Sequence, residues 1–259
     1  KPRRNQALVY YREVVKHHQL RVNPFEEVLK VNKVDNRFTI TTTKGVYQSR
    51  FLTVATGYYG QHNNLEVEGA ELSKVSHYFK EAHPFFNQDV AIIGGKNSAV
   101  DAALELEKAG ANVTVLYRGD HYPKAIKPWI LPNFESLVRH EKIDMHFNAN
   151  VTRITEDSVV YEQDSETHEI PNDHVFAMIG YHPDYDFLQS IGIDIHTNEY
   201  GTAPVYNRET FETNVENCFI AGVIAAGNDA NTIFIENGKY HGGIITQSIL
   251  AKKQTPLES

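Results

Sequence analysis

The stretch that decides the fold is Asp89-Val90-Ala91-Ile92-Ile93-Gly94-Gly95-Lys96-Asn97-Ser98-Ala99-Val100-Asp101. An apolar run stops at two glycines, and a pattern with helical spacing begins directly after them. This order predicts a strand, a tight turn and a helix. Glycines let a backbone approach a pyrophosphate closely, while the free N–H groups and the dipole at a helix N-terminus attract its negative charge. The stretch therefore predicts a dinucleotide site formed by Gly94, Gly95, Lys96, Asn97, Ser98 and Ala99.

The residues that follow complete a βαβ unit. Apolar side chains from Ala99 to Leu106 recur at helical spacing, and Gly110 is placed to end the helix. The next strand leads to Arg118, where a domain that prefers NAD has a carboxylate for the ribose 2′-hydroxyl. An arginine suits a 2′-phosphate, so the pattern favours NADPH. Because Lys96 replaces the middle glycine of G-x-G-x-x-G, an ordinary βα turn with structural glycines is the alternative.

Composition limits the classes of protein to which the chain can belong. It has 259 residues, enough for about two domains, and no apolar run approaches the roughly 18 residues of a membrane span. The net charge of −8 argues against a nucleic-acid partner. The histidines form no H-E-x-x-H motif and no cluster with cysteine, so we expect no metal site. A lone cysteine, Cys218, and no apolar N-terminal segment favour a cytoplasmic protein in which this thiol is buried and structural.

The remaining segments are predicted from their periodicity. We expect a helix over residues 5–19, a surface loop over the nucleotide at residues 121–136 and a buried strand over residues 170–179. A final unit over residues 217–250 pairs a strand ending at Gly222 with a helix from about Gly238. Short segments predict a β-meander: Phe25 to Val34, Arg37 to Thr43 and Val46 to Val54. Its last strand ends at Thr56-Gly57, small residues that let the backbone lie close to a ligand.

Four motifs in a fixed order carry a resemblance to a known family. They are Val54-Ala55-Thr56-Gly57, the central glycine turn, Met178-Ile179-Gly180-Tyr181-His182-Pro183-Asp184, and Asn217-Cys218-Phe219-Ile220-Ala221-Gly222. The chain resembles the two-dinucleotide flavoprotein reductases of the thioredoxin-reductase type. The resemblance implies an α/β, two-dinucleotide-binding (Rossmann-like) fold in which an NADPH domain, residues 76–181, is inserted into a FAD domain, residues 1–75 and 182–259. It also implies that the FAD domain is incomplete here, because its N-terminal βαβ unit is expected before residue 5.

Within that family, the cysteine pattern narrows the resemblance. Thioredoxin reductases carry a C-x-x-C pair near residues 75–79, where this chain has no cysteine, so the sequence argues against thioredoxin reductase itself. The fingerprint of flavin monooxygenases also fails, because Ser73 stands where their glycine precedes the histidine matched by His77. The glycine turn and residues 4–12 are similar to those of the bacillithiol-disulfide reductases. Their proposed active cysteine lies in the N-terminal FAD turn, so no catalytic residue is assigned in this chain.

The resemblance also implies site residues and a reaction. Gly180 and Gly222 fall near the ligands, and Glu236, Asn237 and Gly238 face the flavin ring, although Val223 replaces the family's usual aspartate. Gly119 and Pro123 replace two further arginines of thioredoxin reductases, so phosphate recognition is expected from Arg118 and Lys124.

The function implied is an NADPH- and FAD-dependent oxidoreductase, a homo-oligomer, that reduces a small disulfide such as bacillithiol disulfide. The alternatives are a flavin monooxygenase, a ferredoxin- or flavodoxin-NADP reductase, or a non-catalytic nucleotide-binding regulator.

Overall fold

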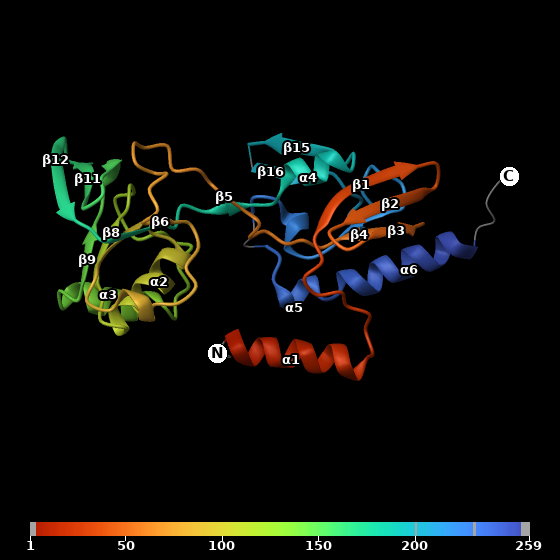
Figure 1. Cartoon of the computed structure of the whole chain (residues 1–259), viewed down its shortest axis with the longest axis horizontal. Coiled ribbons are helices and arrows are strands. Elements are labelled where there is room, and N and C mark those ends of the chain that lie inside the picture. Colours follow the sequence, from red (N-terminus) through yellow and green to blue (C-terminus); the bar gives the residue numbers. More distant parts are fainter. Residues whose placement is uncertain (1–3, 200, 230–231, 255–259) are drawn as a thin grey trace. The chain divides into compact units, whose positions relative to one another are not determined.

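The structure is a computed structural model, and it describes residues 4–199, 201–229 and 232–254. The chain divides into two compact units (Figure 1). We call Tyr59–His182 the inserted unit, and Lys1–Tyr58 together with Pro183–Ser259 the flanking unit. Each unit has its own core of buried apolar side chains, so each is described by itself.

The inserted unit is built on a five-stranded parallel sheet. Its strand order is β6-β13-β7-β8-β9, with β6 Val75–Ser76, β13 His174–Ala177, β7 Asp89–Ile93, β8 Asn112–Leu116 and β9 Ile143–His146. Helix α2, Asn97–Lys108, connects β7 to β8, and helix α3, Leu131–Arg139, precedes β9. The predicted strand, turn and helix at residues 89–101 are therefore confirmed.

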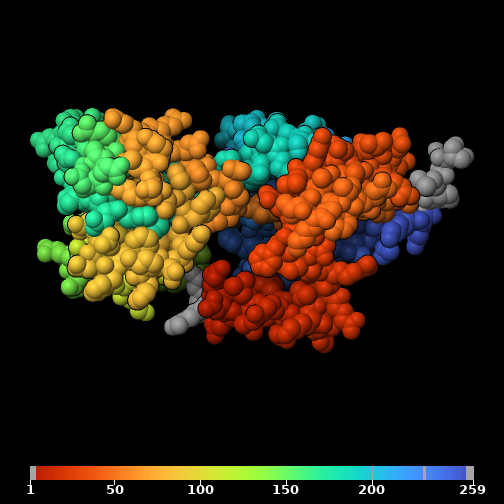
Figure 2. Space-filling view, in the orientation of Figure 1, coloured from red at the N-terminus to blue at the C-terminus, as the bar shows by residue number. Residues whose placement is uncertain are grey.

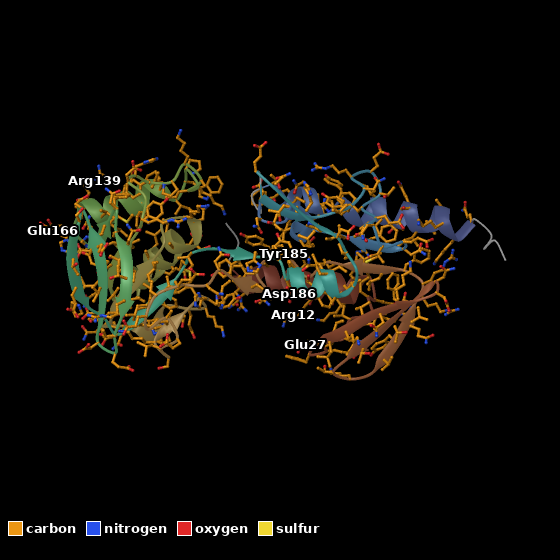
Figure 3. The ribbon with its side chains drawn as sticks, turned by 90° about the horizontal axis from the view of Figure 1, so that it is seen from above. Arg12, Glu27, Arg139, Glu166, Tyr185 and Asp186 are labelled. Carbon is orange, nitrogen blue, oxygen red and sulfur yellow. The ribbon has the colours of Figure 1, made fainter. Side chains whose placement is uncertain are left out.

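The two faces of this sheet have different covers. Val90 and Ile92 pack with the helices α2 and α3, while the alternating residues Ala91 and Ile93 pack on the opposite face. That face is covered by an antiparallel sheet of β10 Asn150–Ile154, β11 Ser158–Gln163 and β12 Glu166–Pro171, whose first residue Glu166 is labelled in Figure 3. Burial on both sides explains why β7 is a continuous apolar run.

The prediction of one strand over residues 170–179 was wrong. Residues up to Pro171 belong to β12, and the parallel strand β13 begins only at His174. Asn172 lies between them, and its side-chain amide donates hydrogen bonds to the carbonyl oxygens of Asp89 and His174. The apolar residues Ile170 and Val175 therefore lie in two different sheets, a change of direction that their shared hydrophobicity does not reveal.

The first domain boundary also differs from the expected residue 76. Residues 59–75 belong to the inserted unit, where β5 Gln61–His62 pairs with β14 Tyr181–His182. Apolar side chains of this segment, among them Leu65, Val67 and Leu72, pack against the core beside β10 and β11. Residues 59–75 have little regular secondary structure, and they belong to the inserted unit because their apolar side chains pack against its core.

The flanking unit begins with α1, Arg4–His17, which has no buried residue among those described. Figure 2 shows this helix and the segment after it, in red, as exposed surface. The predicted β-meander follows as β1 Val28–Val34, β2 Arg37–Thr42 and β3 Val46–Ser49, all antiparallel. The expected third strand breaks after Ser49, whose hydroxyl donates to the carbonyl oxygen of Phe51 at 2.6 Å. The next strand, β4 Leu52–Val54, belongs to a different sheet.

The rest of the flanking unit places β17, Cys218–Ile220, parallel to β4. Helix α4, Tyr185–Ser190, carries Tyr185 and Asp186 (Figure 3), and is followed by the antiparallel pair β15 Ile195–Asn198 and β16 Gly201–Pro204. Two 3₁₀ turns are η1, His83–Phe85 in the inserted unit, and η2, Val223–Ala226. The chain then forms α5, Ile235–Gly238, and α6, His241–Gln254, so the single helix expected from Gly238 begins three residues later.

Candidate functional site

The glycine turn after β7 lies where three strands of the inserted sheet come together. Gly94 has φ +130°, and a Cβ atom on it would overlap the carbonyl group of Met178, just after β13. Its N–H donates to the carbonyl oxygen of Leu116 in β8 at 2.9 Å. The strand order reverses between β7 and β13, and open parallel sheets bind ligands at such a point, outside the carboxyl ends of the strands.

Gly95 is required by a different contact. A Cβ atom there would lie 2.5 Å from the ring of Tyr117, which also lies 2.5 Å from the position of a Cβ on Gly119. The tyrosine ring therefore lies close to two glycines that flank it in space. Any other residue at position 95 pushes the connection after β8 away from the turn.

The start of α2 is open to an anionic ligand. Its N-cap residue, Lys96, has extended backbone angles of φ −92° and ψ −172° and makes no side-chain cap. The N–H groups of the first turn have no intrahelical acceptor, so they are the natural donors to a phosphate. Lys96, which departs from the glycine motif, is exposed and in a conformation that any residue adopts. The substitution for glycine is therefore accommodated without backbone strain.

Asn97, the first residue of α2, is engaged by the connection between β8 and α3. Its Nδ2 donates to the carbonyl oxygen of Ala125 at 2.8 Å, and its Oδ1 accepts from the N–H of Lys127 at 2.9 Å. We call residues 117–130 the clamp loop. Both ends of the Asn97 amide bind this loop, so the amide holds the loop against the glycine turn.

The clamp loop carries the predicted phosphate-binding residues. Arg118 and Lys124 are both exposed, and neither forms an ion pair within the described part of the chain. Ile126 and Ile130 anchor the loop in the core, while Trp129 is 69% exposed. The predicted surface loop over residues 121–136 was wrong in its second half, where α3 begins at Leu131 and ends at Arg139 (Figure 3). Phe134 of that helix is fully buried, which fixes the helix to the sheet.

The turn at Gly180 is held by a residue that the sequence did not single out. Gly180 has φ +108°, and its carbonyl oxygen accepts from the N–H of Asn63 at 3.0 Å. The Asn63 side chain also donates to the carbonyl oxygen of Ile179 at 3.1 Å. Next to it, Tyr181 donates to the carbonyl oxygen of His77 at 2.5 Å. Asn63 lies in an irregular segment of mixed composition, so no pattern of spacing marks it.

In the flanking unit, two strand ends carry predicted site residues side by side. Strands β4 and β17 are parallel neighbours, and the N–H of Ala221 donates to the carbonyl oxygen of Val54 at 2.9 Å. Gly57 and Gly222 follow these strands with φ +81° and +78°, and a Cβ atom on either would meet nothing within 4 Å. Thr56 is exposed beside Gly57. The carboxyl edge of this strand pair therefore has open space above two glycines.

The segment before α6 forms one side of that edge. A Cβ atom on Gly238 would lie 3.7 Å from the Cα of Gly222, so these two predicted site residues are neighbours. Asn237 closes its own turn, accepting from the N–H of Phe234 at 2.7 Å and donating to the carbonyl oxygen of Thr232 at 2.8 Å. Glu236 is exposed. Asn237 is thus committed to the backbone that shapes the turn.

Cys218, in the middle of the flanking core, is fully buried. Burial raises the pKa of its thiol to about 11, so it carries no thiolate at neutral pH. Among the described residues there is no group of three or more His, Cys, Asp or Glu side chains arranged to hold a metal ion. The described helices include none with the length and apolar character of a membrane span.

Comparison with known proteins identifies the family. Residues 1–222 match the model of a family described as pyridine nucleotide-disulphide oxidoreductase. The chain belongs to this family. The predicted enzyme class, an oxidoreductase of the disulfide reductase type that depends on NADPH and FAD, is confirmed at this level.

Individual members of the pyridine nucleotide-disulphide oxidoreductase family resemble the chain over most of its length. Bacilliredoxin reductase Bdr of Bacillus subtilis (strain 168) is 58% identical over 256 residues, 98% of this chain and 78% of that protein. A solved structure of bacillithiol disulfide reductase Bdr (YpdA) from Staphylococcus aureus is 79% identical, covers 98% of this chain and 79% of its own, and has a TM-score of 0.94. Thioredoxin reductase of T. acidophilum, at 23% identity and a TM-score of 0.77 over 96% of this chain and 81% of its own, shows the same fold.

Proposed function

We propose that this protein reduces a low-molecular-weight disulfide, bacillithiol disulfide, with electrons taken from NADPH. The observation that carries the proposal is the combination of the glycine turn at the switch point of the inserted sheet with 58% and 79% identity to two reductases named Bdr. This agreement favours a disulfide reductase over a monooxygenase, a ferredoxin reductase or a regulator without activity.

The inserted unit is proposed to bind NADPH. The pyrophosphate would lie at the first turn of α2, where N–H groups are uncapped, with Lys96 exposed beside it. Arg118 and Lys124 on the clamp loop would pair with the 2′-phosphate. Because both ends of the Asn97 amide already bind the loop, Asn97 would act by holding these cations in place. The turn at Gly180 would close the same edge of the sheet.

The flanking unit is proposed to bind FAD at the carboxyl edge of β4 and β17. The open space above Gly57 and Gly222 fits a flat ring that needs close backbone approach, with Thr56 and Gly238 beside it. When bound there, FAD would supply the two-electron chemistry of the reaction. Asn237 and Glu236 would shape the edge next to Gly238.

The catalytic thiol stays unassigned. Cys218 is the single cysteine in the sequence, and its raised pKa leaves it protonated in the range where disulfide exchange requires a thiolate.

The reaction uses NADPH, which metabolism regenerates inside the cell, and this supports the proposed cytoplasmic location. The homo-oligomer expected from the resemblance remains a prediction.

The test is a comparison of electron acceptors. The purified full-length enzyme with its FAD is supplied with NADPH and, in turn, with bacillithiol disulfide, oxidised thioredoxin and a ferredoxin, and NADPH oxidation is followed by its absorbance. We expect faster oxidation with bacillithiol disulfide than with either protein acceptor. Turnover that depends on ferredoxin alone, or oxygen uptake matched to NADPH without thiol formation, would contradict the proposal.

A further inference from the structure

His241, the first residue of α6, makes a contact that the glycine pattern did not indicate. The N–H of Gly222 donates a hydrogen bond to its Nδ1 atom at 3.1 Å. The imidazole packs against the ring of Phe211, with the ring centroids 4.0 Å apart and the planes inclined by 28°. Only 8% of His241 is exposed. A buried imidazole thus holds the backbone of the turn after β17.

This contact completes the hydrogen bonding of the strand end. The neighbouring residue, Ala221, still donates to β4, whereas Gly222 has turned out of the strand with φ +78° and ψ −159°. Its N–H is bound by His241 instead. A backbone donor left without an acceptor in such a place costs free energy, so the histidine favours this form of the turn over others.

The geometry also fixes the protonation state of the ring. A nitrogen that accepts a hydrogen bond carries no proton, and the imidazolium ion has no acceptor at all. Burial lowers the pKa of His241 from its ordinary value of 6.5. The position at a helix N-terminus disfavours a positive charge further. The Phe211 side chain and the Gly222 backbone both contact the ring, and burial is the cause of its lowered pKa, with no contribution from a charged side chain of the described residues.

We propose that His241 is a positioning residue that holds the Gly222 turn in the form that admits the flavin, and that protonation of His241 releases this hold. The flavin part of the inference rests on the proposed function, in which FAD binds in the open space above Gly222. The folded protein has the lower pKa, so the unfolded or released form takes up the proton first as the pH falls through 6.5. Stability of the turn is therefore present at neutral pH and lost toward acid.

Two substitutions separate the acceptor from the bulk of the ring. In His241→Asn the side-chain oxygen takes the place of Nδ1 and accepts at every pH, because an amide does not titrate in this range. In His241→Leu an apolar side chain fills the site without any acceptor. Two further described histidines with lowered pKa values, His77 and His174, are partly buried and lie in the inserted unit, so their titration is common to all three proteins.

The first readout is the hydrogen exchange of the Gly222 amide, measured by NMR between pH 5 and 8 and corrected for the intrinsic rate at each pH. The second is the dissociation constant of added FAD, from its fluorescence, over the same range. For the wild type we expect protection and FAD affinity to fall together below pH 6.5. His241→Leu should lose protection at every pH and bind FAD about five- to tenfold more weakly at pH 8, as one lost hydrogen bond implies. His241→Asn should match the wild type at pH 8 and keep its protection at pH 5.

Amides of β1 and β2 in the flanking unit serve as the control for folding, since none of these changes should alter their exchange. Wild-type protection of Gly222 in the leucine variant, or the same acid loss in the asparagine variant as in the wild type, would overturn the inference. If Gly222 exchange follows the expected pattern but FAD binds with the same affinity in all three proteins, the flavin role is overturned. Failure of the proposed function has a different signature, the absence of disulfide-dependent NADPH oxidation by the wild type at pH 8.

Discussion

Replacing Asn97 with alanine should lower the preference for NADPH over NADH, although both ends of the Asn97 amide form hydrogen bonds to the protein itself. The substitution removes two hydrogen bonds to the clamp loop, of 2.8 and 2.9 Å, to the backbone of Ala125 and Lys127. Each is worth about 0.5–1.5 kcal/mol, so the loop loses about 1–3 kcal/mol of its hold on the start of α2. If NADPH binds only the docked loop, its dissociation constant rises by about 5- to 150-fold.

NADH provides the internal comparison for Asn97→Ala. It lacks the 2′-phosphate that Arg118 and Lys124 are proposed to bind, so it gains little from a docked loop and should lose less affinity than NADPH. Calorimetric titration of both cofactors with the wild type and the variant measures the difference. Glu105→Ala is the control, because Glu105 is an exposed residue of the same helix that lies outside the predicted dinucleotide site.

A double-mutant cycle tests whether Asn97 acts through the loop. Lys124→Ala alone should weaken NADPH binding, and adding Asn97→Ala to it should cost less than Asn97→Ala costs in the wild type, since the cation that the loop positions is already gone. Equal losses for NADPH and NADH, or full additivity with Lys124→Ala, would refute the idea that the amide works by holding the clamp loop.

Three further changes probe the rest of the molecule. Arg118→Ala should raise the dissociation constant of NADPH by the equivalent of about 1.5–3 kcal/mol and leave that of NADH nearly unchanged, and equal losses in titrations of both would argue against a 2′-phosphate contact. Gly95→Ala should lower the free energy of unfolding by about 1–3 kcal/mol, because its Cβ would lie 2.5 Å from the Tyr117 ring. In the control Gly60→Ala the new Cβ meets nothing within 4 Å, so denaturant titrations should show a free energy of unfolding close to that of the wild type. Cys218 should resist alkylation at pH 7–8, since burial raises the pKa of its thiol to about 11. The Cys218→Ala form of the full-length enzyme should keep most of the disulfide-dependent rate; rapid labelling or a loss of orders of magnitude would contradict the structural role of Cys218.

The parts of the fold that were predictable from the sequence are those in which a local pattern and the tertiary structure agree. The apolar run from Val90 to Ile93 is buried on both faces, and its end at Gly94 coincides with a close backbone contact. The β-meander is predictable for a similar reason, since Asp35-Asn36 and Lys44-Gly45 separate strands that do pair with their neighbours. In both cases consecutive residues belong to adjacent elements of one sheet.

Prediction failed where consecutive residues belong to different sheets. The end of β3 at Ser49 and the start of β4 at Leu52 are three residues apart, yet the two strands lie in different sheets. Likewise, an antiparallel edge strand ends at Pro171 and a central parallel strand begins at His174. Hydrophobicity reports that a strand is buried but not which partner it takes. Membership of residues 59–75 in the inserted unit is likewise decided by packing of Leu65 and Leu72, not by composition.

The polar residues that hold the candidate sites are the least predictable part. Asn63 binds backbone 116 residues away in the sequence and His241 binds backbone 19 residues away, and neither stands in a motif. Asn97 was predicted to contact the cofactor, and the sequence did not indicate that both ends of its amide bind the clamp loop. Such roles depend on which carbonyl or N–H a turn leaves exposed, and that is settled only when the tertiary fold brings the two segments together.

The glycines of the two candidate sites are needed for different physical reasons. In one site they allow parts of the protein to pack together, and in the other they leave space that a ligand could occupy. At Gly94 and Gly95 a side chain would meet the protein itself, so these glycines are needed for β7, β8 and the segment after β13 to come together at all. At Gly57 and Gly222 a Cβ would meet nothing within 4 Å, and the demand is the positive φ, which costs a residue with a side chain about 1–3 kcal/mol. The first pair therefore builds the edge of the inserted sheet, and the second pair leaves an edge of the flanking unit open. A flat cofactor needs open space that the fold does not fill, and the space above Gly57 and Gly222, beside a turn held by His241, is the physical reason for which we propose the flavin site there.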